Sequence, residues 1–109
     1  MEKQSFIFDH IKSFKKPFIL CINGDSMAPA IKSGDYVRVI PYKKNSLKIG
    51  DIIVYKKFYD HLTVHRIQNI ITLSSTRFYC ETKGDNNAEE DGYKVLNSEI
   101  IGIVNRERD

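Results

Sequence analysis

The sequence predicts an all-β fold made of antiparallel sheets. Short runs rich in β-branched and aromatic residues recur along the chain, turn-forming residues separate them, and no helical pattern of the kind that connects parallel strands lies between them. The runs cover residues 18–22, 36–40, 51–57, 62–70, 77–83 and 98–105. Since short links join the runs, we expect antiparallel sheets in a barrel or a sandwich. At 109 residues the chain forms one domain with one core.

Only the N-terminal segment has the period of a helix. In residues 4–14, apolar side chains recur at spacings of three and four residues, which places them on one helical face. They are Phe6, Ile7, Ile11 and Phe14. We therefore expect a short amphipathic helix within residues 1–16, ended by Pro17, and a β domain over residues 17–109. With its neighbouring lysines the helix can bind a membrane surface or a partner protein, but capping the open end of the sheets is the favoured role.

Glycine, aspartate and other turn-forming residues separate the predicted strands. Glycine is frequent in turns because it accepts positive φ, and aspartate because its carboxylate bonds nearby main-chain N–H groups. Such signals lie at residues 33–35, 50–51, 60–61 and 84–92. They predict tight reversals and one longer polar loop.

Charge and hydropathy exclude several classes of protein. The net charge of +3, from 17 basic and 14 acidic residues, is spread along the chain, which argues against dedicated nucleic-acid binding. No window approaches the roughly 20 apolar residues that a membrane-spanning helix needs. The sequence therefore predicts a soluble cytoplasmic protein without a transmembrane segment, in which the N-terminal helix is a candidate for peripheral membrane association.

The two cysteines are too few for a disulfide framework in a chain of this length. Cys21 lies in an apolar run, and Cys80 lies between Tyr79 and Glu81 in another predicted strand. A free cysteine in such a position behaves as a small hydrophobic residue. We expect both to be buried free thiols.

Ser26 lies in a predicted turn, with Gly24 before it and Pro29 just after it. A side chain can project from such a tight bend, and neighbouring main-chain N–H groups can converge on an oxyanion. The alternative is a turn serine that bonds its own backbone. From these residues alone both interpretations stay open.

His65 lies in the run at residues 62–70 and is a candidate general base. In a strand, Thr63, His65 and Ile67 point to one face, so the imidazole shares a face with a predicted core residue. Imidazole suits acid–base chemistry because it titrates near neutral pH in its unperturbed state. The alternative is a half-buried histidine without a chemical role.

The acidic loop near residue 90 contains two aspartates, Asp85 and Asp91. A carboxylate from this loop can hold a histidine in the right tautomer and stabilise its cation. A solvated loop is one alternative, and a calcium loop is another. The EF-hand template fails because Glu90 stands where glycine is needed and Leu96 where the bidentate carboxylate is needed. We therefore predict no metal and no other cofactor.

Five segments, taken in order, resemble one known family. They read GDSMAPAIKSGDYVRV, IGDIIVYKK, TVHRI, TKGDNNAEEDGY and SEIIGIV. This combination, from about Phe18 to Val104, is similar to the serine peptidase group that includes signal peptidases and the self-cleaving repressors related to LexA. The pair His65–Arg66 resembles the branch of endoplasmic-reticulum, archaeal and sporulation-type signal peptidases, since repressors and most bacterial signal peptidases of the group have a lysine as base.

The resemblance implies a serine endopeptidase on a partly open β barrel of the LexA or signal-peptidase type. It implies Ser26 as the nucleophile, His65 as the general base and an aspartate as the orienting carboxylate. Asp91 is favoured as the direct partner of His65, with Asp85 shaping the site, and the reverse assignment stays open.

The substrate implied by the resemblance is an extended peptide or protein segment with small, alanine-like residues at the first and third positions before the cut. Met27 and the strand at residues 18–22 are expected to line the cleft floor. The residues implied in substrate binding are Gly24, Asp25, Met27 and Pro29.

Two other functions stay open. A peptide-binding module of the same fold is less favoured, because binding alone needs no serine, histidine and aspartates together. A dimerising repressor domain is less favoured because His65 stands where that branch has lysine and no basic helix precedes the domain. Signal peptidases normally carry a membrane anchor, which we do not expect here. Trimming a leader from a small peptide or partner protein is therefore favoured over processing of secretory preproteins.

Overall fold

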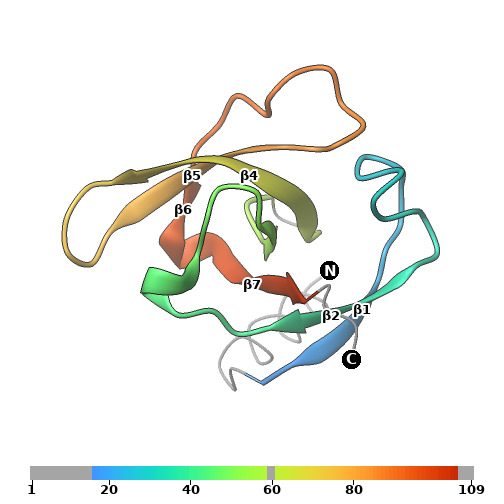
Figure 1. Ribbon diagram of the computed structural model, residues 1–109, viewed down its shortest axis with the longest axis horizontal. Helices are drawn as coiled ribbons and strands as arrows, with labels where there is room; N and C mark the ends of the chain where they lie inside the picture. Colours follow the sequence, from blue (N-terminus) through green and yellow to red (C-terminus); the bar gives the residue numbers. More distant parts are fainter. Residues whose placement is uncertain (1–15, 59–60, 106–109) are drawn as a thin grey trace.

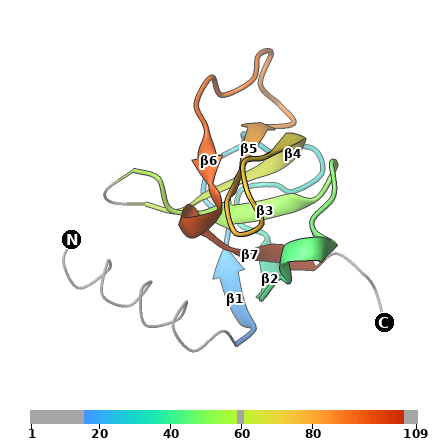
Figure 2. The same ribbon diagram turned by 90° about the vertical axis from the view of Figure 1, so that its left-hand side faces the viewer.

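The computed structural model describes residues 16–58 and 61–105, and within these ranges seven strands form one antiparallel sheet. The strands are β1 (Phe18–Cys21), β2 (Tyr36–Ile40), β3 (Ile52–Tyr55), β4 (Thr63–Thr72), β5 (Phe78–Lys83), β6 (Val95–Leu96) and β7 (Ile100–Asn105). Their order is β1-β2-β7-β3-β4-β5-β6, and the sheet curls into a half-barrel (Figure 1 and Figure 2). The predicted all-β, partly open barrel is confirmed. The helix expected at residues 4–14 lies outside the described residues.

All six predicted strands are present, with differences toward the C-terminal end. The short strand β6 was not predicted, because two residues are too few to show alternation. The strand predicted at residues 98–105 begins only at Ile100, because a 3-10 turn, η2 (Asn97–Glu99), precedes it. A similar turn, η1 (Lys44–Ser46), follows β2. These differences leave the order of the six predicted strands along the chain unchanged.

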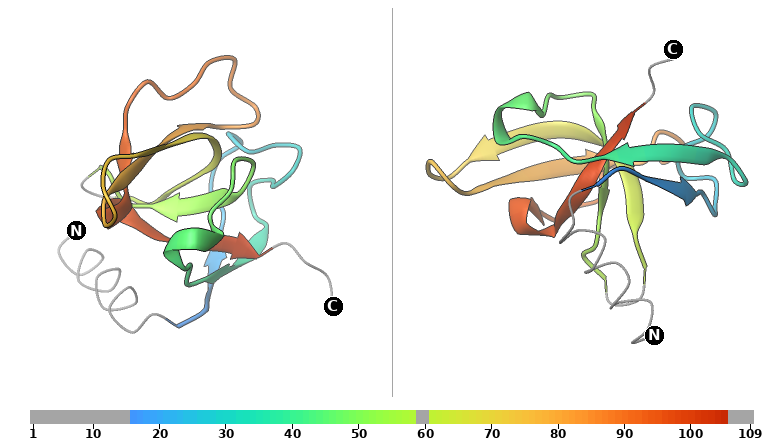
Figure 3. Two further views of the ribbon diagram at one scale, coloured as in Figure 1. Left: turned by 60° about the vertical axis from the view of Figure 1, so that its left-hand side comes forward. Right: turned by 90° about the horizontal axis from the view of Figure 1, so that it is seen from below.

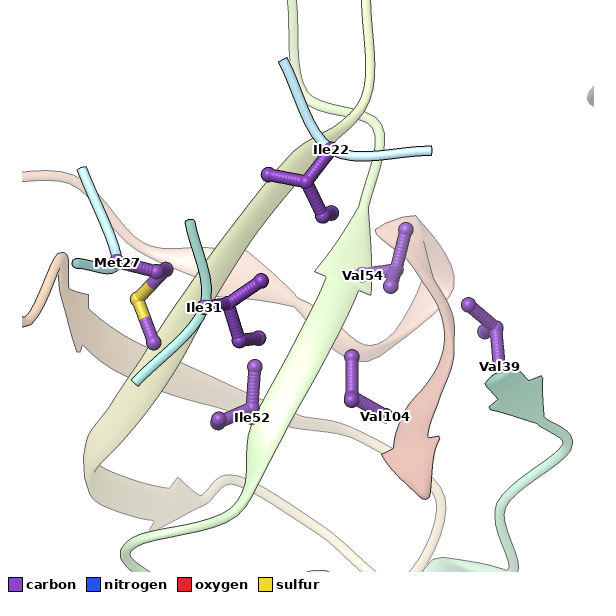
Figure 4. Packing of buried hydrophobic residues seen from close by; sticks show 7 residues of the cluster. All are labelled: Ile22, Met27, Ile31, Val39, Ile52, Val54 and Val104. Carbon is purple, nitrogen blue, oxygen red and sulfur yellow. The ribbon is translucent and has the colours of Figure 1, made fainter. Parts of the chain in front are cut away.

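The central strand β3 is buried on both faces. Ile52 and Val54 join one hydrophobic cluster, and Ile53 and Tyr55 join a second. A strand covered on both faces needs no polar alternation, which explains its unbroken apolar run. Figure 4 shows the first cluster, which consists of Ile22, Met27, Ile31, Val39, Ile52, Val54 and Val104.

Two connections of the half-barrel lie close together (Figure 3). One is the serine turn, residues 23–35 between β1 and β2, drawn in cyan. The other is the acid loop, residues 84–94 between β5 and β6, drawn in orange. The curl of the sheet brings these segments together although about 60 residues separate their centres in the chain. In the described ranges, no helix has the length and apolar character needed to cross a membrane.

The two cysteines differ in exposure. Cys80 is fully buried in the second cluster, where burial raises the pKa of its thiol to about 11. Cys21 is exposed, so the expectation of a buried thiol is wrong there. Since β1 is an edge strand with alternating exposure, Phe18 and Leu20 pack against the first cluster while Cys21 faces outward.

Candidate active site

A cleft of about 710 Å³ lies between β1 with the serine turn on one side and the start of β4 on the other. The acid loop contributes Asn87 and Tyr93 to its wall. Met27 and the strand predicted at residues 18–22 contribute to the lining, and so does Ser26. The cleft is therefore bounded by all three segments in which candidate residues were found.

The serine turn is anchored at its base and at its centre. Two main-chain hydrogen bonds close the base, both with Ile22, at 2.7 and 2.8 Å. Met27 and Ile31 are buried in the first cluster, with exposed fractions of 2% and 1%. Gly24 has a φ of +108°, which favours glycine. Ser26 remains partly exposed at the cleft.

His65 lies on β4 with its ring toward the serine turn. Its Nε2 atom lies 3.2 Å from the Oγ atom of Ser26. The residue is 8% exposed and, as predicted, lies on the same buried face of the strand as Ile67. Across the sheet it is the register partner of Ile53 on the central strand. The imidazole thus emerges from a strand that pairs with the central strand β3 at this position.

The two aspartates of the acid loop have different partners. The Oδ2 atom of Asp91 lies 2.7 Å from the Nδ1 atom of His65. Asp85 instead accepts two hydrogen bonds from Arg66, at 2.9 and 2.8 Å, and these bonds raise the pKa of the guanidinium. Arg66 also donates to the main-chain oxygen of Gly50 at 2.7 Å, which ties the acid loop to the turn before β3. Ser26, His65 and Asp91 therefore form one hydrogen-bonded row, and Asp85 stands outside it.

Hydroxyl groups surround the carboxylate of Asp91. Thr82 donates to Asp91 Oδ2 at 2.6 Å, and Tyr55 donates to the same oxygen at 3.3 Å. The hydroxyls of Tyr55 and Tyr93 lie 2.7 Å apart, and burial raises the pKa of both tyrosines above the ordinary value. Sequence reasoning missed these residues. The sequence signal that could have pointed to Tyr55 is its hydroxyl, the one polar side-chain group in the apolar strand β3.

The acid loop is clamped to the serine turn. The main-chain N–H of Asn86 donates to the carbonyl of Ser26 at 2.8 Å, and its side-chain amide donates to the carbonyl of Asp25 at 3.1 Å. A Cβ atom at Gly84 would lie 2.7 Å from that Ser26 oxygen, so only glycine allows this approach. Sequence reasoning assigned no role to Gly84 or Asn86, although both belong to the quoted motif TKGDNNAEEDGY.

The other predicted site residues fall into two groups. Gly24 and Met27 line the cleft. Asp25 and Pro29 lie in the same turn, but they are not among the described residues of the lining. Within residues 16–58 and 61–105, no three histidine, cysteine or carboxylate side chains are arranged to hold a metal ion.

A serine, a histidine and an aspartate in one hydrogen-bonded row beside a cleft are an arrangement that serine peptidases share on several unrelated folds. The family model described as Peptidase S24-like matches residues 3–104, so this chain belongs to the Peptidase S24-like family. The resemblance found from the five sequence segments is thereby confirmed.

Two curated relatives carry the same description. The chain is similar to the signal peptidase complex catalytic subunit SEC11 of Debaryomyces hansenii, with 33% identity over 103 residues, which are 86% of this chain and 60% of that protein. It is also similar to the signal peptidase complex catalytic subunit SEC11 of Plasmodium falciparum, with 29% identity over 97 residues, 82% of this chain and 51% of that protein. The chain thus spans between 51% and 60% of the length of these relatives. No solved structure matches it.

Proposed function

We propose that this protein is a serine endopeptidase that cleaves a leader or signal-like peptide after small residues. The observation that carries the proposal is the row of contacts beside the cleft, 3.2 Å from Ser26 Oγ to His65 Nε2 and 2.7 Å from His65 Nδ1 to Asp91 Oδ2. Membership of a peptidase family and the similarity to signal peptidase catalytic subunits support it.

His65 acts as the base and then as the acid in this mechanism. With its Nδ1 proton donated to Asp91, its Nε2 atom accepts the proton of Ser26 as Oγ attacks the substrate carbonyl. The protonated imidazole then gives this proton to the leaving amine, and the C–N bond breaks to leave an acyl-enzyme. Water, deprotonated by the same Nε2 atom, hydrolyses the ester and restores the serine.

The serine turn supplies the oxyanion site in this proposal. The main-chain N–H of Ser26 and a neighbouring N–H in the same turn stabilise the tetrahedral intermediate, each donor contributing about 3 kcal/mol in well-studied proteases. Two hydrogen bonds from Asn86 support this role, because its side-chain amide donates to the Asp25 carbonyl and its main-chain N–H donates to the Ser26 carbonyl. They fix the two peptide planes that carry the N–H groups of Ser26 and Met27. The acid loop thereby preorganises the turn.

The substrate lies extended along β1, whose outer edge pairs with no other described strand. An unpaired edge offers main-chain N–H and C=O groups to a peptide, which gives affinity without regard to sequence. Met27 and the residues that flank Ser26 limit the size of the side chain before the cut. A partner protein or a membrane surface, reached through the N-terminal segment, is part of the proposal, although that segment lies outside the described residues.

The test compares the wild-type protein with Ser26→Ala and with the exposed turn control Ser74→Ala. Each is incubated with a library of extended peptides that carry small residues, and cleavage is followed by mass spectrometry from pH 5 to 9. We expect cleavage by the wild type and by Ser74→Ala but none by Ser26→Ala, with less cleavage in acid because a protonated imidazole accepts no proton. Binding of peptides by all three proteins without cleavage would replace the peptidase by a peptide-binding module.

A further inference from the structure

Tyr55 is a buried tyrosine whose hydroxyl lies in a cluster of polar groups. The side chain is fully buried at the end of the central strand β3. Its hydroxyl lies 2.7 Å from that of Tyr93, 3.2 Å from that of Thr82 and 3.3 Å from Asp91 Oδ2. Thr82, on β5, is 1% exposed. Polar groups this deeply buried are costly unless each has a partner, so their arrangement is specific.

Counting hydrogens fixes the direction of the hydrogen bond between Thr82 and Asp91. A carboxylate has acceptors only, so the hydroxyl of Thr82 donates to Asp91 Oδ2, 2.6 Å away. The hydroxyls of Tyr55 and Tyr93 share a short contact, and Tyr55 also reaches the same carboxylate oxygen. Burial raises the pKa of Tyr55 strongly, so its hydroxyl keeps its proton and remains a donor near neutral pH. The hydroxyls of Thr82 and Tyr55 therefore both donate to one oxygen atom of Asp91.

That oxygen atom is the one that contacts the imidazole. Asp91 Oδ2 lies 2.7 Å from His65 Nδ1, so it meets the threonine, the tyrosine and the histidine together. The ring of Tyr55 also packs edge-on beside the His65 ring, with centroids 6.5 Å apart and planes at 78°. Asp91 belongs to a loop, whereas Tyr55 belongs to the central strand β3 and Thr82 to the strand β5. The strands thus hold a loop carboxylate in place.

We propose that Thr82 and Tyr55 are positioning residues that act through Asp91 on His65. They hold Oδ2 at the point where it accepts the Nδ1 proton, and so they fix both the tautomer and the orientation of the imidazole. The expected effect of these residues on the cleavage rate rests on the proposed peptidase function. Thr82 has the larger share, because its hydrogen bond to Asp91 is shorter, 2.6 Å against 3.3 Å for Tyr55.

The first experiment measures kcat and KM for a cleaved peptide with Thr82→Val, Thr82→Ser and Tyr55→Phe. We expect kcat to fall about 10- to 100-fold in Thr82→Val, since a misplacement of about 1 Å can cost that much. KM stays within about twofold. Thr82→Ser keeps the hydroxyl, so its kcat stays near the wild-type value. The kcat of Tyr55→Phe lies between those of the two Thr82 variants. Matched controls are Thr72→Val, which is exposed on β4, and Tyr79→Phe, whose ring contacts Lys94.

The second experiment needs no cleavage. The proton NMR signal of His65 Nδ1–H, hydrogen-bonded to Asp91, is recorded in the wild type and in the same variants, with circular dichroism as a check of folding. We expect the signal to shift or vanish in Thr82→Val and to persist in Thr82→Ser. If it persists unchanged in Thr82→Val and Tyr55→Phe, or if kcat does, the positioning role is overturned. If the wild type cuts no peptide but the signal still shifts in Thr82→Val, the positioning role is retained and the peptidase function is rejected.

Discussion

The two walls of the cleft hold their functional residues in different ways. On one wall, Ser26 is placed by the backbone of the serine turn, with main-chain hydrogen bonds at the base and Met27 packed beneath it. On the other wall, His65 is placed by side chains, since Asp91 and the hydroxyls behind it hold the imidazole. The position of Ser26 therefore depends on packing and main-chain geometry, whereas the position of His65 depends on hydrogen-bonding side-chain groups. The two walls should therefore fail under different substitutions.

The largest effect is expected from the aspartates. Asp91→Asn should lower kcat by about 10⁴-fold, as the same change does in a well-studied serine protease, because the amide leaves the imidazole in the wrong tautomer. Asp85→Asn should have a much smaller effect, since it weakens the pair with Arg66 and leaves the contact between Asp91 and His65 in place. Steady-state kinetics of the two variants on one peptide make the measurement. A larger loss in Asp85→Asn would assign that residue as the partner of His65 and break the comparison.

The serine wall is tested by its apolar anchor. Met27→Ala should lower the free energy of unfolding by about 2–5 kcal/mol, the range for deleting a large buried side chain. Met27→Leu keeps the volume and should cost less than about 1.5 kcal/mol. Urea unfolding followed by circular dichroism measures both variants. Equal, small losses in the two would mean that the turn stands without its buried anchor.

The smallest expected effect is a loss of stability at alkaline pH, caused by buried groups in the core behind His65. Burial raises the pKa of Cys80 from 9.0 to about 11 and that of Tyr55 upward as well. The unfolded chain loses these protons near their ordinary pKa values while the folded chain keeps them, so unfolding is favoured as the pH rises. Thermal unfolding from pH 7 to 11 should show stability falling from about pH 9.

Two cysteine variants sharpen that measurement. The stability of Cys80→Ala should fall less steeply than that of the wild type above pH 9, because this variant lacks one of the buried groups with a raised pKa. Cys21→Ala, which removes an exposed thiol, is the matched control and should keep the wild-type slope. Identical slopes in all three proteins would mean that Cys80 contributes nothing to the alkaline loss.

Much of the fold was predictable because strands leave local signals. Alternation and β-branched residues mark β2, β4 and β5 without any knowledge of their partners. Features that depend on the order of strands in the sheet, such as the exposure of a side chain, were not predictable. Cys21 lies in an apolar run, yet its strand is at an edge, and only the position of the strand decides that its thiol is exposed.

The candidate site shows the same division. Ser26, His65 and the two aspartates stood out because serine, histidine and aspartate can act together in catalysis and because their segments resemble a family. The hydroxyls of Tyr55 and Thr82 did not stand out, since both residues are common in strands. Their role depends on the pairing of β4 with β5 and on the return of the acid loop, which are contacts between distant parts of the chain.

The exposed thiol of Cys21 makes this protein easy to label. Cys21 lies in the cleft wall with Ser26, and the chain's other thiol is buried with a raised pKa, so an alkylating dye at neutral pH attaches at one place. No engineered cysteine is needed. A fluorophore there reports peptide arrival in real time, and a disulfide-capped fragment library screened against the same thiol gives covalently trapped ligands for the cleft.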